Sequence, residues 1–195
     1  MSLERRALPE VIETERLRLR GWEASDAEDV FDYARDPEWS KFLRILPVPY
    51  AFADAEQFIV RQSRLDRVVH PGWAIDLDGS VIGGINLRFS FDHLLAEMGY
   101  SVARAHWNRG FCTEAASAVV DAAFGTHPDL NRVRAMADVM NTASQRVLEK
   151  VGMRKEGVLR QNRIERGHAI DEAWFGILRG EWEEGRRSDE RRLSG

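Results

Sequence analysis

Residues 106–115 (HWNRGFCTEA) include a glycine, Gly110, where a strand is expected to give way to a helix. Glycine lets the backbone approach a ligand closely, and the start of the next helix presents unpaired N–H groups and the positive end of a dipole. Such a turn suits a pyrophosphate, whose charge is spread over several oxygens. A plain strand–helix connection explains one glycine equally well, because neither the GxxxxGK[ST] nor the GxGxxG pattern is present.

Residues 141–153 (NTASQRVLEKVGM) place a hydroxyl at the entrance of a second helix. Asn141 is a good N-cap, and Ser144 follows one turn later on the same face, so both side chains crowd the helix entrance. Gly152 is a typical residue at the end of a helix. A capped amphipathic helix therefore explains Asn141 and Gly152 without a ligand, whereas the early position of Ser144 leaves room for a chemical role.

Composition excludes several classes of protein. The 195-residue chain is 44% hydrophobic and 31% charged, which fits one globular α/β domain. Its formal charge is −4, with arginines and carboxylates interleaved, so no basic stripe is available for nucleic acid. No apolar run is long enough for a membrane span, and the first residues lack the apolar core of a signal peptide. We therefore expect a cytoplasmic protein without membrane contacts.

The chain has one cysteine, Cys112, so no intrachain disulfide can form. No Cys/His set has the spacing of a zinc site, and we expect no metal. A lone cysteine suggests a nucleophile, but the favoured interpretation of Cys112 is a small residue that packs like alanine.

The hydrophobic pattern predicts one domain with the order β-α-α-β-β-β-α-β-α-β-β. Leu17 and Leu19 alternate with arginines in the first strand, and a capping box at 25–28 opens the first helix. An apolar, irregular or short-helical loop spans 38–52, and Asp54 opens the second helix. The remaining elements are strands 73–77 and 81–88 around an Asp78–Ser80 turn, strand 96–102, helix 110–124, strand 132–139, helix 141–151 and strands 153–159 and 169–178. We expect the domain to cover 1–183 and a flexible tail to cover 184–195.

Together these segments resemble the GNAT acyltransferase superfamily, and its RimJ/RimL-type branch in particular. The matching strings occur in order over roughly 13–182. They are 14–20 (TERLRLR), Gly99-Tyr100, 107–111 (WNRGF), 113–115 (TEA), 141–153, and the run from 156–160 through Asp171 to Glu181-Trp182. Two residues depart from the family pattern, since Cys112 replaces a small Ala or Gly and Met153 replaces a Phe.

The resemblance implies an α/β (α+β) GNAT fold, with a mixed central sheet of about seven strands flanked by about four helices. It also implies an N-acetyltransferase that passes the acetyl group of acetyl-CoA directly to a primary amine, without a covalent enzyme intermediate or a metal. The amine would belong to a protein N-terminus or a small molecule. The residues expected at the cofactor are Ser101, Val102 and Ala103 along the pantetheine arm, Asn108, Arg109, Gly110, Phe111, Cys112 and Thr113 at the pyrophosphate, and Asn141 and Ser144 towards the thiol.

Two residues are candidates for the proton transfers. The matched family position makes Ser144 the expected proton donor to the departing sulfur, although a capping role explains it nearly as well. Glu97, on the strand that leads to the cofactor loop, is a candidate base that would act on the amine through a water. Strand alternation opposes that role, because Glu97 faces away from a cofactor-facing Val102 unless a bulge intervenes. Further titratable candidates, each also explained as a solvated loop residue, are His70, His93 and His168.

A second class of function stays open at this point, a non-catalytic acyl-CoA-binding or regulatory module with the same fold. Release of free thiol from acetyl-CoA in the presence of amines separates the two classes. A nucleotide-binding Rossmann protein is disfavoured, because its glycine fingerprint is missing. The aromatic side chains of the loop over 38–50 suit the wall of an acceptor groove, and they suit a core or a dimer contact equally well. Both a monomer and a homodimer are therefore compatible with the sequence.

Overall fold

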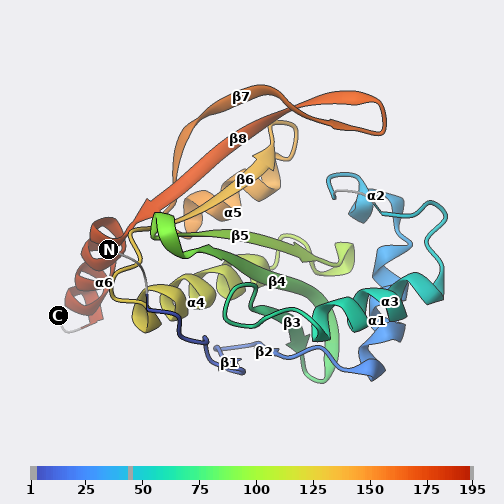
Figure 1. The fold of residues 1–195 in the computed structure, drawn as a ribbon, viewed down its shortest axis with the longest axis horizontal. Helices are drawn as coiled ribbons and strands as arrows, with labels where there is room; N and C mark the ends of the chain where they lie inside the picture. Colours follow the sequence, from blue (N-terminus) through green and yellow to red (C-terminus); the bar gives the residue numbers. More distant parts are fainter. Residues whose placement is uncertain (1–3, 44–45, 194–195) are drawn as a thin grey trace.

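The computed structural model of the protein describes residues 4–43 and 46–193. Their strands form one eight-stranded sheet in the order β1-β2-β3-β4-β5-β6-β8-β7 (Figure 1). β5 and β6 run parallel, and all other neighbours run antiparallel. The mixed α/β fold is confirmed, with the short β1 added to the predicted strands. The strands are β1 (Ile12–Glu13), β2 (Arg18–Arg20), β3 (Gly72–Leu77), β4 (Ser80–Ser90), β5 (Leu95–Val102), β6 (Arg132–Asp138), β7 (Arg154–Glu165) and β8 (His168–Leu178).

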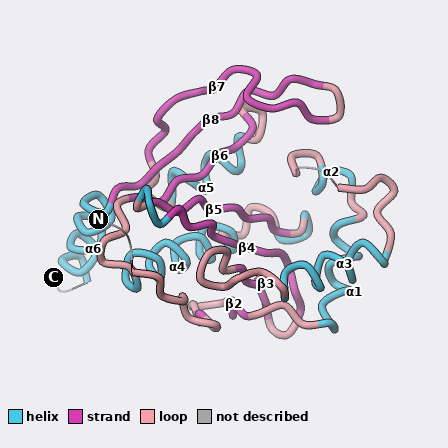
Figure 2. Tube along the Cα trace, viewed as in Figure 1, coloured by secondary structure: helices cyan, strands magenta, loops and turns pink. Residues whose placement is uncertain are grey.

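The helices that pack on the sheet form two groups, α4 with α5 and α1 with α3 (Figure 2). α4 and α5 contribute buried side chains to the main hydrophobic core, whereas α1 and α3 form a smaller cluster of their own. The helices are α1 (Ala27–Ala34), α2 (Pro37–Ser40), α3 (Phe52–Ser63), α4 (Phe111–Thr126), α5 (Thr142–Lys150) and α6 (Arg179–Leu193), with single 3-10 turns at Ala24–Asp26, Phe91–His93 and Arg104–His106.

The two groups of helices lie on opposite faces of the sheet. Trp22, which packs against the cluster of α1 and α3, lies 2.7 Å from the position that a Cβ would take on Gly84 of β4. The next residue of β4, Ile85, points into the main core with α4 and α5. Successive residues of a strand face opposite sides. One face of the sheet is thus covered by α4 and α5, and the other carries α1 and α3 over the start of β4.

The turn between β3 and β4 has the geometry that its sequence predicts. Asp78 and Gly79 have φ angles of 54° and 90°, and two successive positive values are the mark of a type I′ turn. Glycine adopts such angles freely, and aspartate tolerates them better than most side chains. The turn sets the register of β4. Residues 83–90 of β4 then pair with the whole length of β5.

The N-terminal half differs from the sequence prediction in two places. Arg16 and Leu17, predicted as the start of the first strand, lie instead in a turn between β1 and β2, which is closed by the Thr14 amide donating to the Leu17 carbonyl over 2.9 Å. α3 begins at Phe52, because Asp54 acts inside its first turn by accepting the Ala51 amide over 2.8 Å. A short helix, α2, occupies the start of the segment over 38–52, in agreement with the predicted irregular or short-helical loop. Two residues of that loop, Arg44 and Ile45, lie outside the described residues.

The C-terminal part has more regular structure than the sequence predicts. β7 continues to Glu165 and forms a long hairpin with β8. α6 occupies most of the segment 184–195, where a flexible tail was expected. Trp182 of α6 stacks on Phe124 of α4 with ring centroids 5.1 Å apart, and its indole N–H donates to Asp121 over 2.6 Å. These contacts anchor the helix, and they depend on the tertiary fold.

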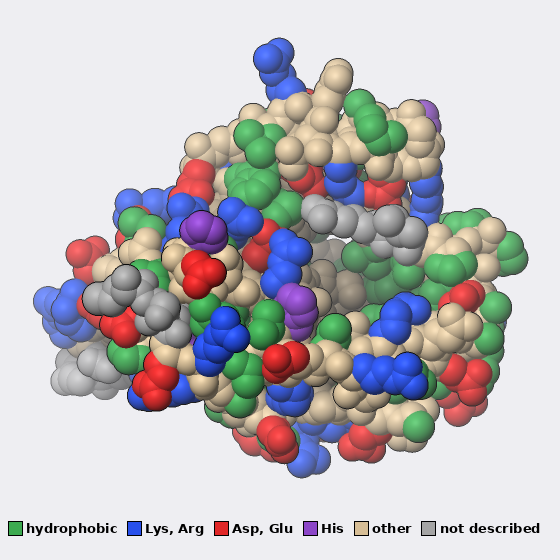
Figure 3. Space-filling view, in the orientation of Figure 1, with side chains coloured by type: hydrophobic (Ala, Val, Ile, Leu, Met, Phe, Trp, Pro, Cys, Tyr) green, Lys and Arg blue, Asp and Glu red, His purple; other side chains and the backbone are tan. Residues whose placement is uncertain are grey.

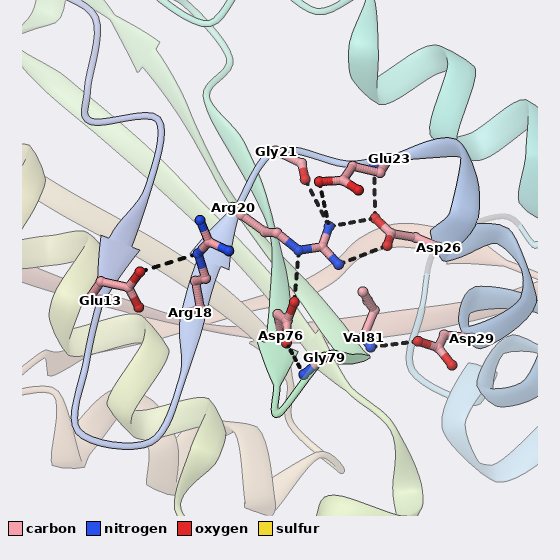
Figure 4. A network of polar contacts seen from close by, with 10 residues as sticks. All are labelled: Glu13, Arg18, Arg20, Gly21, Glu23, Asp26, Asp29, Asp76, Gly79 and Val81. Carbon is pink, nitrogen blue, oxygen red and sulfur yellow. Dashed lines mark hydrogen bonds and ion pairs between the residues drawn. The ribbon is translucent and has the colours of Figure 1, made fainter.

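A charged network fixes α1 to the sheet (Figure 4). Arg20 of β2 donates to both carboxylate oxygens of Asp26 at 2.9 Å and to Asp76 of β3 at 2.8 Å. The Arg20 side chain is 12% exposed and that of Asp26 only 4%, so the charges are paired with little water around them. Asp29 of α1 accepts the Val81 amide over 2.6 Å. The start of α1 is therefore held against β2, β3 and β4.

Candidate functional site

The sheet opens between its two parallel strands (Figure 1). β5 and β6 pair only at their starts, over 95–97 and 132–134. Further along, β5 remains paired with β4, and β6 remains paired with β8. The facing edges, 98–102 of β5 and 135–138 of β6, thus carry backbone groups that the neighbouring strand does not use. We call this divergence the fork.

The β5 arm of the fork is straight and tightly paired on its other side. The register between β4 and β5 runs without a shift up to the Gly83–Val102 pair. A Cβ on Gly83 would lie 2.2 Å from the Ser101 carbonyl oxygen, so this close pairing requires glycine. Ala103 extends the pairing by donating its amide to the Ile82 carbonyl over 2.7 Å. Ser101, Val102 and Ala103 therefore present one edge to β4 and the opposite edge to the fork.

The connection from β5 to α4 depends on two left-handed residues. The Trp107 indole N–H donates to the Val102 carbonyl over 2.7 Å and folds the connection back on β5. Asn108 and Gly110 have φ angles of 60° and 83°, in a region that glycine and, to a lesser degree, asparagine tolerate. The residue types of this turn are those its backbone needs, and the turn sets the direction in which α4 begins.

The first turn of α4 offers unused amides. Glu114 is the first residue whose amide the helix uses, bonding to the Gly110 carbonyl over 3.0 Å. The amides of 111–113 have no carbonyl one turn earlier in the helix. These donors, together with the positive end of the dipole of a 16-residue helix, face the turn at 108–110. The donor set fits a pyrophosphate.

An ion pair from a distant segment braces this turn. Arg16, between β1 and β2, donates from Nε to Glu114 Oε2 over 2.7 Å and from Nη1 to the Arg109 carbonyl over 3.0 Å. The Thr14 hydroxyl donates to Glu114 Oε1 over 2.6 Å. The guanidinium also lies 4.6 Å from the centroid of Phe111. Both segments belong to the motifs described above, but the sequence alone does not predict their contact. The available signal was a carboxylate in the first turn of an anion-binding helix, which requires a compensating cation.

Arg109 supplies an additional positive charge beside the turn. Its guanidinium lies 5.0 Å from the Phe111 centroid and 3.5 Å from His106 Nδ1, and it has no carboxylate partner among the described residues. Burial and the Arg109 charge hold the pKa of His106 below its usual value, so this imidazole is neutral at neutral pH. Arg16 is matched by Glu114, which leaves Arg109 as the cation available to a phosphate.

Asn141 and Ser144 stand at the start of α5, where the sequence places them. The Asn141 side chain accepts the Ser144 amide over 3.0 Å, so Asn141 is the N-cap. The Ser144 hydroxyl lies 3.0 Å from the hydroxyl of Tyr100, on the open arm of β5. This contact brings the entrance of α5 to the fork. Tyr100 belongs to the Gly99-Tyr100 string that resembles the family, and nothing in the neighbouring sequence distinguishes it from a core tyrosine.

Glu97, the candidate base, does not join this group. Its carboxylate accepts hydrogen bonds from Arg88 over 2.8 Å and from Arg134 over 2.9 Å. Since β5 has no bulge against β4, Glu97 and Tyr100 point to opposite faces of the strand. Glu97 as the base therefore stays a prediction, and both of its carboxylate oxygens are engaged by arginines on the face of β5 opposite Tyr100.

Cys112 lies at the edge of the main core, and burial raises the pKa of its thiol to about 12. That environment suits packing and opposes a nucleophilic role. Across residues 4–43 and 46–193, no group of three or more His, Cys, Asp and Glu side chains is placed to hold a metal ion. No helix in the same ranges is long and apolar enough to cross a membrane.

Comparison with known proteins identifies the family. Residues 16–154 match the family described as the acetyltransferase (GNAT) domain. The chain is 33% identical over 181 residues to an uncharacterized N-acetyltransferase, p20, of Bacillus licheniformis, covering 89% of this chain and 98% of p20. A solved structure assigned as an acetyltransferase of T. thermophilus has a TM-score of 0.83 at 27% identity, covering 96% of this chain and 99% of the other. RimJ of Mycobacterium smegmatis, solved with CoA-disulfide, has the same fold with a TM-score of 0.77 at 23% identity over 89% of each chain. The chain belongs to the GNAT family of acetyltransferases, and it is an acetyltransferase enzyme.

Proposed function

We propose that the protein transfers the acetyl group of acetyl-CoA to a primary amine, with Ser144 as the donor to the departing sulfur. One observation carries the proposal: the unused amides of α4, the free edge of β5 and the Ser144 hydroxyl all border the fork. Acetyl-CoA supplies an activated acetyl thioester when it is bound. All other parts of the proposal concern what the chain's own residues do around it.

The binding residues divide along the length of the cofactor. The amides of 108–113 hold the pyrophosphate, and the Arg109 charge supports them. The edge of Ser101 to Ala103 that faces the fork provides backbone hydrogen bonds for the pantetheine arm, beside the Val102 carbonyl that the Trp107 indole already engages. Asn141 and Ser144 lie at the thiol end. RimJ of Mycobacterium smegmatis, which has the same fold, was solved with CoA-disulfide, and this supports CoA as the ligand of this fold.

The proton balance of the reaction needs a donor at sulfur and a neutral amine. The amine loses one proton and the thiol gains one, so no net proton is consumed. Backbone N–H groups at the fork polarise the acetyl carbonyl oxygen in the manner of an oxyanion hole. The Ser144 hydroxyl donates to sulfur as that atom gains charge.

The acceptor we favour is an α-amine, as at a protein N-terminus. Both Glu97 oxygens already accept hydrogen bonds from arginines, so an acceptor that needs little help from a base is favoured. An α-amine has a pKa near 8 and is partly neutral at neutral pH, whereas a lysine amine, with a pKa near 10.4, is almost fully protonated. Without Glu97, the α-amine is the easier nucleophile. This acceptor also suits the RimJ/RimL-type branch.

The acceptor would approach from the face that carries α1 and α3. In Figure 3 the surface is hollowed between the β7–β8 hairpin and the part of the molecule formed by α1, α2 and α3. An extended N-terminal segment would fit between the hairpin and the helices, with its amine directed towards the fork.

An acetylation assay tests the proposal. The protein is incubated with acetyl-CoA and three kinds of amine: peptides with a free α-amine, the same peptides with a blocked N-terminus and an internal lysine, and small primary amines. Thiol release and the mass of the product are followed together. We expect release with free α-amines, and its loss in the Gly110→Asp variant. If acetyl-CoA binds but no amine releases thiol, the protein is instead a non-catalytic acyl-CoA-binding or regulatory module.

A further inference from the structure

Tyr100 makes two contacts with one residue at the entrance of α5. Its hydroxyl lies 3.0 Å from Ser144 Oγ and 3.1 Å from the Ser144 carbonyl oxygen. The two residues are 44 positions apart, on β5 and α5, which border the fork from opposite sides. The proton donor we assign is thus not an isolated side chain but half of a hydroxyl pair.

Counting protons shows what this pair can do. Each hydroxyl has one proton and can accept hydrogen bonds as well. If the Tyr100 proton goes to the carbonyl, the Ser144 proton can satisfy the Tyr100 oxygen, and nothing is directed outward. If the Tyr100 proton goes to Ser144 Oγ, the Ser144 proton is released for a third group. The helix itself already supplies the carbonyl of Ser144 with the amide four residues on, so the second arrangement leaves no acceptor unsatisfied.

The surroundings of Tyr100 keep it a donor. Its ring packs against the main core, beside the start of α4. Burial, and to a lesser extent the neighbouring Cys112 thiol, raises the pKa of the Tyr100 phenol far above its usual value, and the hydrogen bond with Ser144 offsets this only in part. The phenol therefore stays protonated at any pH at which the enzyme works, and it can donate a hydrogen bond without losing its proton.

We propose that Tyr100 is a positioning residue, which donates to Ser144 Oγ and thereby directs the Ser144 proton at the cofactor sulfur. This inference rests on the proposed role of Ser144. The chain of donors runs from the Tyr100 hydroxyl to Ser144 Oγ and from the Ser144 hydroxyl to sulfur. A hydroxyl that accepts a hydrogen bond becomes a better donor, because successive hydrogen bonds polarise one another. Tyr100 thus both orients and strengthens the Ser144 donor.

The inference can be tested on the binary complex with CoA, without an acceptor. A thiolate absorbs more strongly in the ultraviolet than a thiol, so a pH titration of the bound complex gives the pKa of the CoA thiol. The same protein with desulfo-CoA gives the baseline and removes the absorbance of the tyrosines. The titration is repeated for wild type, Ser144→Ala, Tyr100→Phe and the double variant. Thr142→Ala, which removes an exposed hydroxyl from the same helical turn, is the matched control.

The expected result is a thiol pKa that is lowest in wild type and in Thr142→Ala. Ser144→Ala should raise it by about one unit, and Tyr100→Phe by about half a unit, a roughly threefold change in the thiolate equilibrium, as expected for the loss or weakening of one hydrogen bond. The double variant should match Ser144→Ala, because Tyr100 acts only through Ser144. Incorporation of 3-fluorotyrosine, whose phenol is a stronger donor, should lower the pKa further and does not depend on the fold of a variant.

Three results would overturn the inference, and they have different meanings. If Ser144→Ala raises the thiol pKa but Tyr100→Phe and fluorotyrosine leave it unchanged, Tyr100 only packs, and the role of Ser144 stands. If the double variant exceeds Ser144→Ala, Tyr100 contacts sulfur directly and is not a positioning residue. If Ser144→Ala leaves the thiol pKa unchanged, the proposed role of Ser144 is wrong, and the inference about Tyr100, which rests on it, is wrong as well.

Discussion

Arg16 and Glu114 are 98 positions apart in the chain, yet the Arg16 guanidinium approaches the Glu114 carboxylate to 2.6 Å, and the Arg16 backbone amide donates to the same carboxylate over 2.8 Å. Glu114 lies in the first turn of α4, where a negative charge would repel a pyrophosphate. Arg16 and Thr14 neutralise it from the side of the β1–β2 turn. The N-terminal segment thereby belongs to the proposed cofactor site, although it lies at the far edge of the sheet.

Replacing Arg16 with glutamine should weaken CoA binding. The variant leaves the Glu114 charge uncompensated beside the phosphates and removes the hydrogen bond to the Arg109 carbonyl. A hydrogen bond to a charged group contributes about 1.5–3 kcal/mol at most, and the partial exposure of Arg16 reduces this. We expect the dissociation constant, measured by calorimetry, to rise about five- to thirtyfold. Arg18→Gln is the matched control, since Arg18 pairs with Glu13 on the surface. Equal affinities in all three proteins would remove Arg16 from the site.

The stability that Glu114 provides should depend on pH. Burial by itself raises the pKa of this carboxyl, but hydrogen bonds from Thr14 and Arg16, together with the Arg16 charge, outweigh it and hold the pKa below its usual value of 4.5. A group with a depressed folded-state pKa stabilises the fold fully above its unfolded-state value and loses that contribution as pH falls through the folded-state value. The difference in unfolding free energy between wild type and Glu114→Gln should be constant at neutral pH and shrink below 4.5. Denaturant titrations at several pH values measure it, and a difference that grows on acidification contradicts the assignment.

Gly110→Ala tests the geometry of the cofactor turn. Gly110 has φ of 83°, which costs a residue with a side chain about 1–2 kcal/mol. Its Cβ would also lie 3.3 Å from Arg16 Nη2. We expect the turn to shift and CoA affinity to fall about tenfold, in line with that strain. Gly125→Ala is the control in the same helix, because a Cβ there meets nothing within 4 Å. That substitution should leave CoA affinity unchanged and stabilise the protein by about 0.5–1 kcal/mol.

Cys112 should be dispensable for catalysis. Burial raises the pKa of its thiol to about 12, so the reactive thiolate is scarce at neutral pH. We expect slow labelling by a thiol reagent in the folded protein and rapid labelling after denaturation. Cys112→Ala should keep CoA binding and most of the turnover, since its backbone amide remains. A loss of turnover by orders of magnitude with CoA binding intact would show that the thiol takes part in the reaction.

The parts of the fold that the sequence predicts are those determined by the types of residues a few positions apart. Asp78-Gly79 specifies its turn because the backbone there needs two positive φ angles. Asn141 specifies the start of α5 because its side chain reaches an amide three residues away. Strand alternation places Glu97 and Val102 on opposite faces of β5, and the structure agrees, since β5 has no bulge against β4. In each case the deciding contact lies within a few residues.

The parts that sequence missed depend on contacts between distant segments. The Arg16–Glu114 and Tyr100–Ser144 contacts join residues 98 and 44 positions apart, and no periodicity encodes such pairings. The segment 184–195 was expected to be a flexible tail because its composition is strongly charged, and most of it is helical as the continuation of α6, which Trp182 docks on α4 just before that segment. The motifs therefore identify only some of the residues of the site. The motifs mark the groups offered to the ligand, while the residues that hold those groups in place come from elsewhere in the chain.

Ser144→Ala should lower kcat and leave acetyl-CoA affinity almost unchanged. The substitution keeps the helix cap, because Asn141 accepts the backbone amide of residue 144, which alanine retains. A positioned proton donor typically contributes a factor of about 10² to 10⁴, and the loss should fall on kcat because the hydrogen bond matters mainly as sulfur gains charge. Thr142→Ala, with an exposed hydroxyl in the same turn, should behave as wild type. The effect of Ser144→Ala should also shrink with a donor whose thiol is more acidic, since that thiolate leaves unaided. A kcat within roughly twofold of wild type, far below the expected range, would make Ser144 a structural residue and leave water to protonate the thiolate.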